Sequence, residues 1–358
     1  MIRTTRFEAA EFGGPIKAIA RELPEPTGTE VVVEVSHCGV CHTDLHVHHG
    51  GYEIGGGEEL RFEDRGVKPP LVLGHEIVGK VAAAGPDVDR EFSGPVAVYP
   101  WIGCGTCFRC QAEEDHLCAA GRYLGVFAPG GYAHHVVVPH PRYLFDIGDI
   151  DAATASLFGC SGLTSFGALA KIADLSKEAA VLIIGAGGLG QTTISLARQM
   201  GWTRLIAIDT SPEKRQLALE AGVFAAVDPK TSDAEALKAV AGAPILAALD
   251  FVGSEETASL AAGTLEKGGS LVLIGLFGGE FRYPLPLFPV RALKVQGSYV
   301  GSLKDMRDYI AHVRTFGVPK LPITKRPMES AGDVLTALSR GEIAGRTVLV
   351  NTSCDRTD

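Results

Sequence analysis

The chain has 358 residues, of which 46% are hydrophobic, 21% are charged and 44 are glycine. This length exceeds one ordinary hydrophobic core, so we expect two domains, and the composition excludes a disordered or fibrous chain. The formal net charge of -9 argues against a broad nucleic-acid surface, which needs clustered Lys and Arg.

The amino-terminal segment MIRTTRFEAAEFGG lacks the apolar core of a secretory signal. No uninterrupted apolar run approaches the roughly 18 residues that span a bilayer. We therefore expect a cytoplasmic protein without a membrane partner. Eight cysteines would be unusual as disulfides in that compartment, which keeps thiols reduced, so metal binding is their leading explanation.

The first 150 residues contain short β-rich segments, such as VVVEV at 31–35 and EIVGKVAAA at 76–84, separated by Pro and Gly. This pattern predicts a small, mostly antiparallel β domain with little helix. The segment 50–70 is rich in glycine and in charges of both signs. It is therefore predicted to be an exposed loop.

Four cysteines follow in a C-x2-C-x2-C-x7-C pattern: Cys104, Cys107, Cys110 and Cys118. Four thiolates can complete a tetrahedral shell and leave no position for water or substrate, which is typical of a structural zinc site. An iron–sulfur centre or a redox thiol cluster is the alternative, but nothing else suggests electron transfer. Nucleic-acid binding is disfavoured because FRCQAEEDHLC mixes its single Arg with acids.

From about residue 162, apolar strands alternate with amphipathic helices. VLIIG at 181–185, LIAID at 205–209 and SLVLIG at 270–275 are strands of this series. The alternation predicts a doubly wound, parallel α/β sheet of the Rossmann type. Near residue 297 it ends, and the last strand, RTVLV, could return to the first domain.

A G-x-G-x-x-G motif follows the first predicted strand of this series and opens a helix. Its members are Gly185, Gly187, Gly188, Leu189 and Gly190. In this context the glycines allow close backbone approach to a pyrophosphate at the helix amino terminus.

Asp209 ends the next predicted strand, where a carboxylate can accept hydrogen bonds from ribose hydroxyls and repel a 2'-phosphate. NAD is therefore favoured over NADP. The alternative is that Asp209 caps the turn before Ser211 and Pro212. Lys214 either supports the ribose or lies on a solvated helix face.

Six segments occur in the order found in the zinc-containing medium-chain alcohol dehydrogenases, and the match runs along the whole chain. They are CGVCHTDLH (38–46), GHEIVG (74–79), the four-cysteine segment, GCSGLTSFGAL (159–169), GAGGLG (185–190) and GRTVLV (345–350). The chain therefore resembles this family. The main departure is the segment 50–70, which is longer than in compact members.

The resemblance implies a GroES-like, β-rich catalytic domain formed by both ends of the chain and a Rossmann domain for NAD. We assign residues 1–161 to the catalytic domain with its structural-zinc lobe, 162–297 to the Rossmann domain and 298–358 to the return. The implied reaction is hydride transfer between a primary or secondary alcohol and NAD, giving an aldehyde or ketone. The implied assembly is a homodimer or homotetramer.

Carried over by position, Cys41, His75 and Cys160 correspond to the ligands of a catalytic zinc ion, so the chain is expected to hold two zinc ions. One histidine and two cysteines form the ligand set known for alcohol dehydrogenases, and each residue taken singly could be an ordinary core residue. Asp44 would orient His75, and Glu76 would lie beside the metal.

The remaining roles implied by the resemblance concern the proton, the cofactor and the substrate. Thr43 and His46 would relay the proton of the alcohol to solvent, and Thr43 would also line the substrate pocket. The implied cofactor contacts are His42 and Arg346 at the pyrophosphate, and the backbone of Leu276, Ser298 and Val300 at the nicotinamide.

Trp101, just before the four-cysteine segment, is predicted to line the substrate pocket; alternatively it packs beneath that segment. Polyol, threonine, formaldehyde and cinnamyl alcohol dehydrogenases share this framework and remain alternatives. A non-enzymatic redox sensor would have little reason to keep an open zinc site, a relay and a nucleotide loop together.

Overall fold

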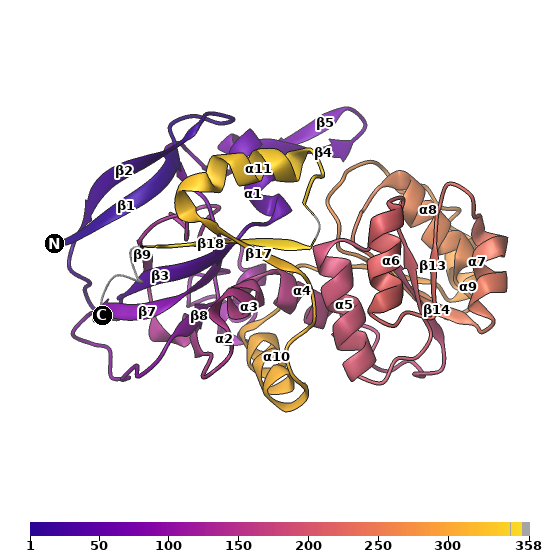
Figure 1. Cartoon of the computed structure of the whole chain (residues 1–358). Helices are drawn as coiled ribbons and strands as arrows, with labels where there is room; N and C mark the ends of the chain where they lie inside the picture. Colours follow the sequence, from indigo (N-terminus) through magenta and orange to yellow (C-terminus); the bar gives the residue numbers. More distant parts are fainter. Residues whose placement is uncertain (344, 353–358) are drawn as a thin grey trace.

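The computed structural model describes residues 1–343 and 345–352. The chain forms two regions that lie side by side, each built on its own sheet (Figure 1). Residue 344 and residues 353–358, which include Cys354 and the end of the predicted return segment, lie outside the described residues.

The first region is built on a mostly antiparallel sheet and a smaller one packed beside it. The larger sheet contains, in spatial order, β10 (Leu144–Asp146), β8 (Val96–Val98), β7 (Glu76–Ala84), β3 (Val31–Gly39), β18 (Arg346–Val350) and β17 (Ile323–Pro327), and β9 (His135–Val138) also pairs with β3. The smaller sheet contains β2 (Ile16–Leu23), β1 (Ile2–Ala9) and β6 (Leu71–Val72).

The final strand joins the sheet of the first region, because β18 pairs antiparallel with β3 and parallel with β17. Strand β17 was not among the predicted strands. Its sequence has few apolar residues, and Lys325 and Arg326 are exposed. The sheet is therefore assembled from segments near both ends of the chain.

The segment 50–70 corrects one prediction, since it is not a loop throughout. Strands β4 (Gly51–Gly55) and β5 (Glu58–Arg61) form a hairpin, followed by a 3-10 turn, η1 (Glu63–Arg65). Gly55, Gly56 and Gly57 make the turn with positive φ angles of 101°, 63° and 80°, which favour glycine. The buried side chains of Phe62 and Val67 anchor its base in the core.

The tip of this hairpin touches the second region. A Cβ atom added at Gly55 would lie 2.7 Å from Glu280 Cγ and 2.9 Å from the carbonyl oxygen of Gly279, and one added at Gly278 would lie 2.8 Å from the carbonyl oxygen of Glu53. The backbones are thus too close for side chains at these positions. The hairpin bridges the two regions at the top of Figure 1.

The second region is a six-stranded parallel sheet with the strand order of a Rossmann fold. In spatial order it contains β13 (Ala225–Val227), β12 (Leu205–Ile208), β11 (Ala180–Ile184), β14 (Ile245–Asp250), β15 (Ser270–Leu273) and β16 (Lys294–Gly297). The central strand β11 is buried on both faces: Val181 and Ile183 belong to one apolar cluster, and Leu182 and Ile184 to another. This explains its continuous apolar sequence.

The helices cover these sheets and connect the two regions (Figure 1). They are α1 (His42–His49), α2 (Phe108–Gln111), α3 (Ala152–Ser156), α4 (Ser161–Ala170), α5 (Gly188–Gln199), α6 (Pro212–Glu220), α7 (Ala234–Ala241), α8 (Glu255–Thr264), α9 (Leu287–Arg291), α10 (Leu303–Phe316) and α11 (Ala331–Ser339). Shorter 3-10 turns are η2 (Asp115–Leu117), η3 (Pro141–Tyr143), η4 (Leu157–Gly159) and η5 (Met328–Ser330).

Helix α4 lies where the chain passes from one region to the other, and its first residue, Ser161, precedes the predicted boundary at 161/162. It packs against α5 and α10, and Leu163 belongs to the apolar cluster that also contains Tyr309 and Ile183. The core is thus continuous between the two sheets.

No single helix within the described ranges is long and apolar enough to cross a membrane; one bent pair, Ala152–Gly159 with Ser161–Ala170, meets those criteria only when taken together.

Candidate active site

A cleft of about 1530 Å³ lies between the two regions. One wall carries residues of α1 and the segment before α4, and the opposite wall carries the glycine motif and the segment after β16. This volume exceeds that of an ordinary drug-sized ligand site, so the cleft can hold a dinucleotide together with a small substrate.

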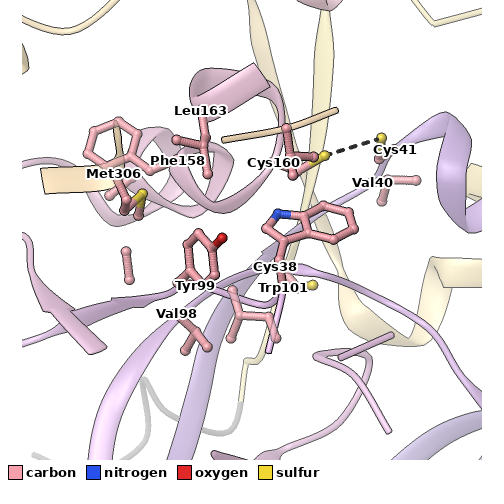
Figure 2. Packing of buried hydrophobic residues seen from close by; sticks show 14 of the residues in the cluster. Cys38, Val40, Cys41, Val98, Tyr99, Trp101, Phe158, Cys160, Leu163 and Met306 are labelled. Atoms are coloured by element: carbon pink, nitrogen blue, oxygen red, sulfur yellow. Dashed lines mark hydrogen bonds between the residues drawn. The ribbon is translucent and has the colours of Figure 1, made fainter. Parts of the chain in front are cut away.

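Cys41, His75 and Cys160 come together beside the cleft, which Cys41 and Cys160 line, although the three residues are far apart in sequence. Cys41 precedes α1, His75 precedes β7 and Cys160 precedes α4. Their ligand atoms all lie within 4.8 Å of one another, and the two Sγ atoms are 4.0 Å apart (Figure 2). Two sulfurs that bind one tetrahedral zinc ion at about 2.3 Å lie roughly 3.8 Å apart, so this spacing fits zinc.

His75 provides a second sign that the three residues bind a metal. Its ring is completely buried, and its Nε2 atom has no hydrogen-bond partner among the described residues. An unpartnered buried nitrogen is costly unless another group satisfies it, and a metal ion would do so. The donor set of one imidazole and two thiols therefore fits a zinc ion with one open position.

Asp44 fixes the geometry of these ligands. Its carboxylate is fully buried and accepts hydrogen bonds from the Cys41 and Gly74 backbone N–H groups at 2.9 and 3.0 Å, and it lies 3.1 Å from His75 Nδ1. Burial opposes the charged form of His75, but the adjacent Asp44 and Cys41 raise its pKa well above the usual value. Asp44 thus holds the ring so that Nε2 faces the two sulfurs.

Glu76 and Arg346 form a buried ion pair next to the ligands. Glu76 also accepts a hydrogen bond from the Ser161 backbone N–H at 3.0 Å, and Arg346 donates to the Val40 carbonyl oxygen at 3.0 Å. Burial raises the pKa of Glu76, although Arg346 partly opposes the shift. The pair links β7, α4 and β18 around Cys160.

Cys104, Cys107, Cys110 and Cys118 form a second group, whose ligand atoms also lie within 4.8 Å of one another. Sulfur–sulfur distances of 3.5 Å for Cys107–Cys110 and 3.7 Å for Cys107–Cys118 match four thiolates around one ion. Hydrogen bonds from Thr106 lower the pKa of Cys104 to about 6, whereas burial raises that of Cys110 to about 12. This donor set fits a closed zinc site.

The glycine motif opens α5 at the edge of the cleft. Gly185 has a φ of 89°, and a Cβ atom at Gly190 would lie 2.0 Å from the Gly185 carbonyl oxygen, so the turn has no room for a side chain there. Nothing lies within 4 Å of a Cβ atom added at Gly187, which faces open space. Gly188 and Leu189 complete the motif and line the cleft.

The carboxylate of Asp209 lies next to this motif. Its Oδ2 accepts a hydrogen bond from the Ala186 backbone N–H at 2.8 Å, and its Oδ1 accepts one from Ser211 at the same distance. The carboxylate therefore supports both the glycine turn and the start of α6. It does so with one lone pair on each oxygen, which leaves capacity for ribose hydroxyls.

Asp209 lies behind the glycine turn, outside the lining of the cleft, whereas six further predicted cofactor residues line the cleft itself: His42, Lys214, Leu276, Ser298, Val300 and Arg346. Arg346 lies against the motif, since a Cβ atom at Gly188 would be 2.4 Å from its Cδ. Val300 has a φ of 42°, a strained conformation for a β-branched residue. Such strain is often found where the backbone must present groups to a ligand.

Thr43 and His46 lie on α1 and line the cleft. Thr43 Oγ1 is 3.8 Å from Cys41 Sγ, next to the ligand group. The half-buried His46 ring packs edge-on against Tyr52 of the hairpin, with 5.3 Å between ring centroids. Burial lowers the pKa of His46 below its usual value, with a smaller contribution from His42.

The sequence allowed two positions for Trp101, in the substrate pocket or in the core, and the side chain has features of both. It lines the cleft, and its ring lies 5.6 Å from that of His75, beside Cys160 in Figure 2. It is also only 2% exposed and donates a hydrogen bond from Nε1 to the Gly159 carbonyl oxygen at 2.8 Å. Most of the indole is therefore core, and one edge meets the cleft.

Sequence reasoning missed other residues of this wall: Tyr52, Arg65, Tyr123, Phe127 and Tyr299. None belongs to a motif with metal-binding or nucleotide-binding spacing. Only the aromatic content of the segments 50–70 and 120–130 hinted at them.

Two family models match the chain. The alcohol dehydrogenase GroES-like domain matches residues 27–149, and the zinc-binding dehydrogenase domain matches residues 188–315. The first match includes Cys41, His75 and the four-cysteine group, and the second begins inside the glycine motif.

Full-length relatives agree with these matches. An NAD-dependent alcohol dehydrogenase of Saccharolobus solfataricus is 34% identical over 95% of this chain and 98% of its own length, and one of Sulfurisphaera tokodaii is 33% identical with the same coverage. The crystal structure of an alcohol dehydrogenase of Aeropyrum pernix superposes with a TM-score of 0.87 at 28% identity, covering 97% of this chain and 99% of that one.

Two glycines of the motif allow binding and stability to be separated. Gly187→Ala should leave the free energy of unfolding nearly unchanged, because nothing lies within 4 Å of its new methyl group. The methyl group would instead stand where a pyrophosphate approaches, so the Kd for NAD should rise about tenfold or more, equivalent to about 1.4 kcal/mol.

Gly190→Ala provides the contrast, since its methyl group would overlap the Gly185 carbonyl oxygen. It should lower the free energy of unfolding by about 1–3 kcal/mol. Chemical denaturation and titration calorimetry measure the two quantities. Unchanged NAD affinity in Gly187→Ala would show that the cofactor does not lie against this turn.

Proposed function

Because the chain belongs to the zinc-containing medium-chain alcohol dehydrogenase family and is an NAD-dependent alcohol dehydrogenase, we propose that Cys41, His75 and Cys160 hold the zinc ion at which the alcohol reacts. The observation that carries this proposal is the unpartnered Nε2 of His75, which lies within 4.8 Å of two thiols that line the same cleft as the glycine motif. The four-cysteine group would hold a second, structural zinc ion.

When bound, zinc in such a site lowers the pKa of a coordinated alcohol and polarises the corresponding carbonyl, and NAD supplies the hydride acceptor. The residues of this chain then position the substrate and move its proton. Thr43 Oγ1, beside Cys41, would accept the proton of the alcohol and donate its own onward. The low pKa of His46 keeps its ring neutral near pH 7, so it can accept a proton at the cleft surface.

Cofactor binding would be divided among three parts of the cleft. The backbone of the glycine motif, with His42 and Arg346, would contact the pyrophosphate. Asp209 would accept hydrogen bonds from the adenosine ribose, with Lys214 nearby, which supports NAD over NADP. The backbone of Leu276, Ser298 and Val300 would contact the nicotinamide.

The substrate would be a primary or secondary alcohol with an apolar substituent. Trp101, Tyr123, Phe127 and Tyr299 form a mostly aromatic wall next to the ligand group. Such a wall would leave most hydroxyls of a polyol without partners, which is costly. This observation favours the alcohol dehydrogenases proper over the polyol type.

We also propose a homo-oligomer in the cytoplasm. Strand β16 is an edge of the parallel sheet, and exposed apolar residues precede it in the chain, including Leu285, Leu287 and Val290. An open strand edge next to apolar surface favours pairing with a second copy. The two thiol-rich metal groups suit a reducing compartment.

Light scattering should give two or four times the chain mass of 37.7 kDa; a monomer at micromolar concentration would contradict this.

The metal assignment predicts two zinc ions per chain, measured by elemental analysis of protein purified without chelators. Cys41→Ser and Cys104→Ser should each lower the content to one. Cys41→Ser should abolish alcohol oxidation, whereas Cys104→Ser should chiefly reduce stability.

Cys38→Ser is the matched control, because Cys38 is a buried thiol outside both groups. It should keep two zinc ions. A content of one in the unmodified protein, or an unchanged content in Cys104→Ser, would refute the pair of sites.

The relay makes a prediction about pH. His46 accepts a proton only in its neutral form, so alcohol oxidation should fall as the pH drops through its lowered pKa. His46→Gln should reduce kcat by about tenfold at pH 7, which is less than the rate factor of about 10²–10⁴ typical of a positioned acid or base. At pH 9 the reduction should be smaller, because hydroxide and buffer base in the solvent can accept the proton instead.

Thr43→Val should nearly abolish oxidation at every pH, because it removes the hydroxyl beside Cys41. Zinc content and NAD affinity serve as controls for both variants. A parallel pH profile in His46→Gln and the unmodified enzyme would remove His46 from the mechanism.

A further inference from the structure

The substrate side of the cleft has an aromatic wall that leads outward from the ligand group. The ring of Trp101 lies 5.6 Å from that of His75, Tyr123 lies 5.4 Å from Trp101, and Phe127 lies 5.6 Å from Tyr123, measured between centroids. Each of the three rings beyond His75 lines the cleft. A substrate that reacts at the ligand group therefore extends along an apolar path.

Arg65 lies at the outer end of this path. It closes the 3-10 turn after the hairpin, and its guanidinium carbon is 5.5 Å from the centroid of Phe127. The side chain lines the cleft and is exposed. No carboxylate within the described ranges lies within 4.0 Å of its nitrogens, so its charge is not neutralised by an ion pair.

The positive charge of Arg65 interacts with a residue that lines the cleft, Tyr123. Burial raises the pKa of Tyr123 to about 12, and Arg65 opposes this rise. The two acids next to it in the turn, Glu63 and Asp64, are exposed and do not line the cleft. Arg65 is therefore the charged side chain of this turn that lines the cleft.

The other cations of the cleft lie elsewhere. Lys214 and Arg346 flank the glycine motif, where the cofactor would bind. Lys171 lines the cleft near His116, whose pKa it helps to lower, and Asp305 acts on the same histidine with the opposite sign. That corner has a carboxylate that lines the cleft, Asp305, whereas Glu63 and Asp64 beside Arg65 do not line it.

We propose that Arg65 is a specificity residue that binds a carboxylate at the far end of the substrate, so that the enzyme prefers alcohols and aldehydes in which an aromatic or extended apolar body separates the reacting carbon from an anionic group. This inference rests on the proposed function. A guanidinium forms paired hydrogen bonds with a carboxylate, and the aromatic wall provides apolar contacts for the body of such a substrate. Cation–π contact with Phe127 holds the guanidinium toward the path.

The test compares three carboxylates with their neutral amides: 4-(hydroxymethyl)benzoate, 4-(hydroxymethyl)phenylacetate and 3-[4-(hydroxymethyl)phenyl]propanoate. The quantity measured is the ratio of kcat/KM for acid and amide with NAD. The ratio should exceed one for at least one spacer length in the unmodified enzyme and should fall as salt is added. Arg65→Gln should lower it by up to about fivefold, the upper end of the range for an exposed ion pair, and Arg65→Lys should retain part of it.

Arg61→Gln is the matched control. Arg61 is an exposed arginine of the same hairpin, paired with Glu59 at 3.5 Å, and it does not line the cleft. Its removal should leave the ratio unchanged. Lys171→Gln tests the other corner, and a loss of the ratio there instead of in Arg65→Gln would overturn the proposal.

An unmodified enzyme that prefers all three amides, or a ratio that Arg65→Gln leaves unchanged, would also overturn it. These results are distinct from failure of the proposed function. That failure would appear as no NAD reduction with the amides or with benzyl alcohol, in which case the inference falls with it.

Discussion

A carboxylate that is fully removed from water must have its oxygens satisfied by donors, and in this chain that requirement positions the metal ligands. Asp44 has no exposed surface, and its partners come from three segments: the Cys41 backbone, the Gly74 backbone with the ring of His75, and the Tyr132 hydroxyl. Satisfying one buried charge therefore brings Cys41 and His75 into register. The ligand site results from the packing of this carboxylate as much as from the ligands themselves.

Glu76 extends the same logic to the third ligand and to the end of the chain. It follows His75 directly, accepts from the backbone next to Cys160 and pairs with Arg346 on β18. Arg346 in turn lies against the glycine motif. One line of buried charge thus runs from the ligand group to the nucleotide turn, and breaking the pair would leave an uncompensated charge at its centre. The buried Glu76–Arg346 ion pair therefore fixes the position of the metal-ligand group relative to the glycine motif.

Sequence reasoning predicts which residues lie together where the physical signal is local. The glycine motif, the strand before it and Asp209 lie within one βαβ unit, and the four cysteines lie within a single short segment, so spacing alone predicts their chemistry. Cys41, His75 and Cys160 have no common spacing, and only the resemblance to a family connected them. The hairpin was predicted as a loop because its three glycines hide the pairing of Tyr52 with Leu60. Arg65 and its aromatic neighbours could not be found from sequence, because only folding places them along one wall.

The contact between the hairpin tip and the loop 278–280 has a kinetic consequence. The backbones of Gly55 and Gly279 meet without intervening side chains, so any rotation that widens the cleft must separate them. In many enzymes, ligands enter and leave a cleft between two regions by opening and closing of this kind. Tyr52 lies on the first strand of the same hairpin and Arg65 follows its second strand, and both line the substrate end of the cleft. We therefore expect opening for cofactor exchange to displace the substrate wall as well, which would couple product escape to cofactor exchange and make turnover sensitive to the length of this hairpin.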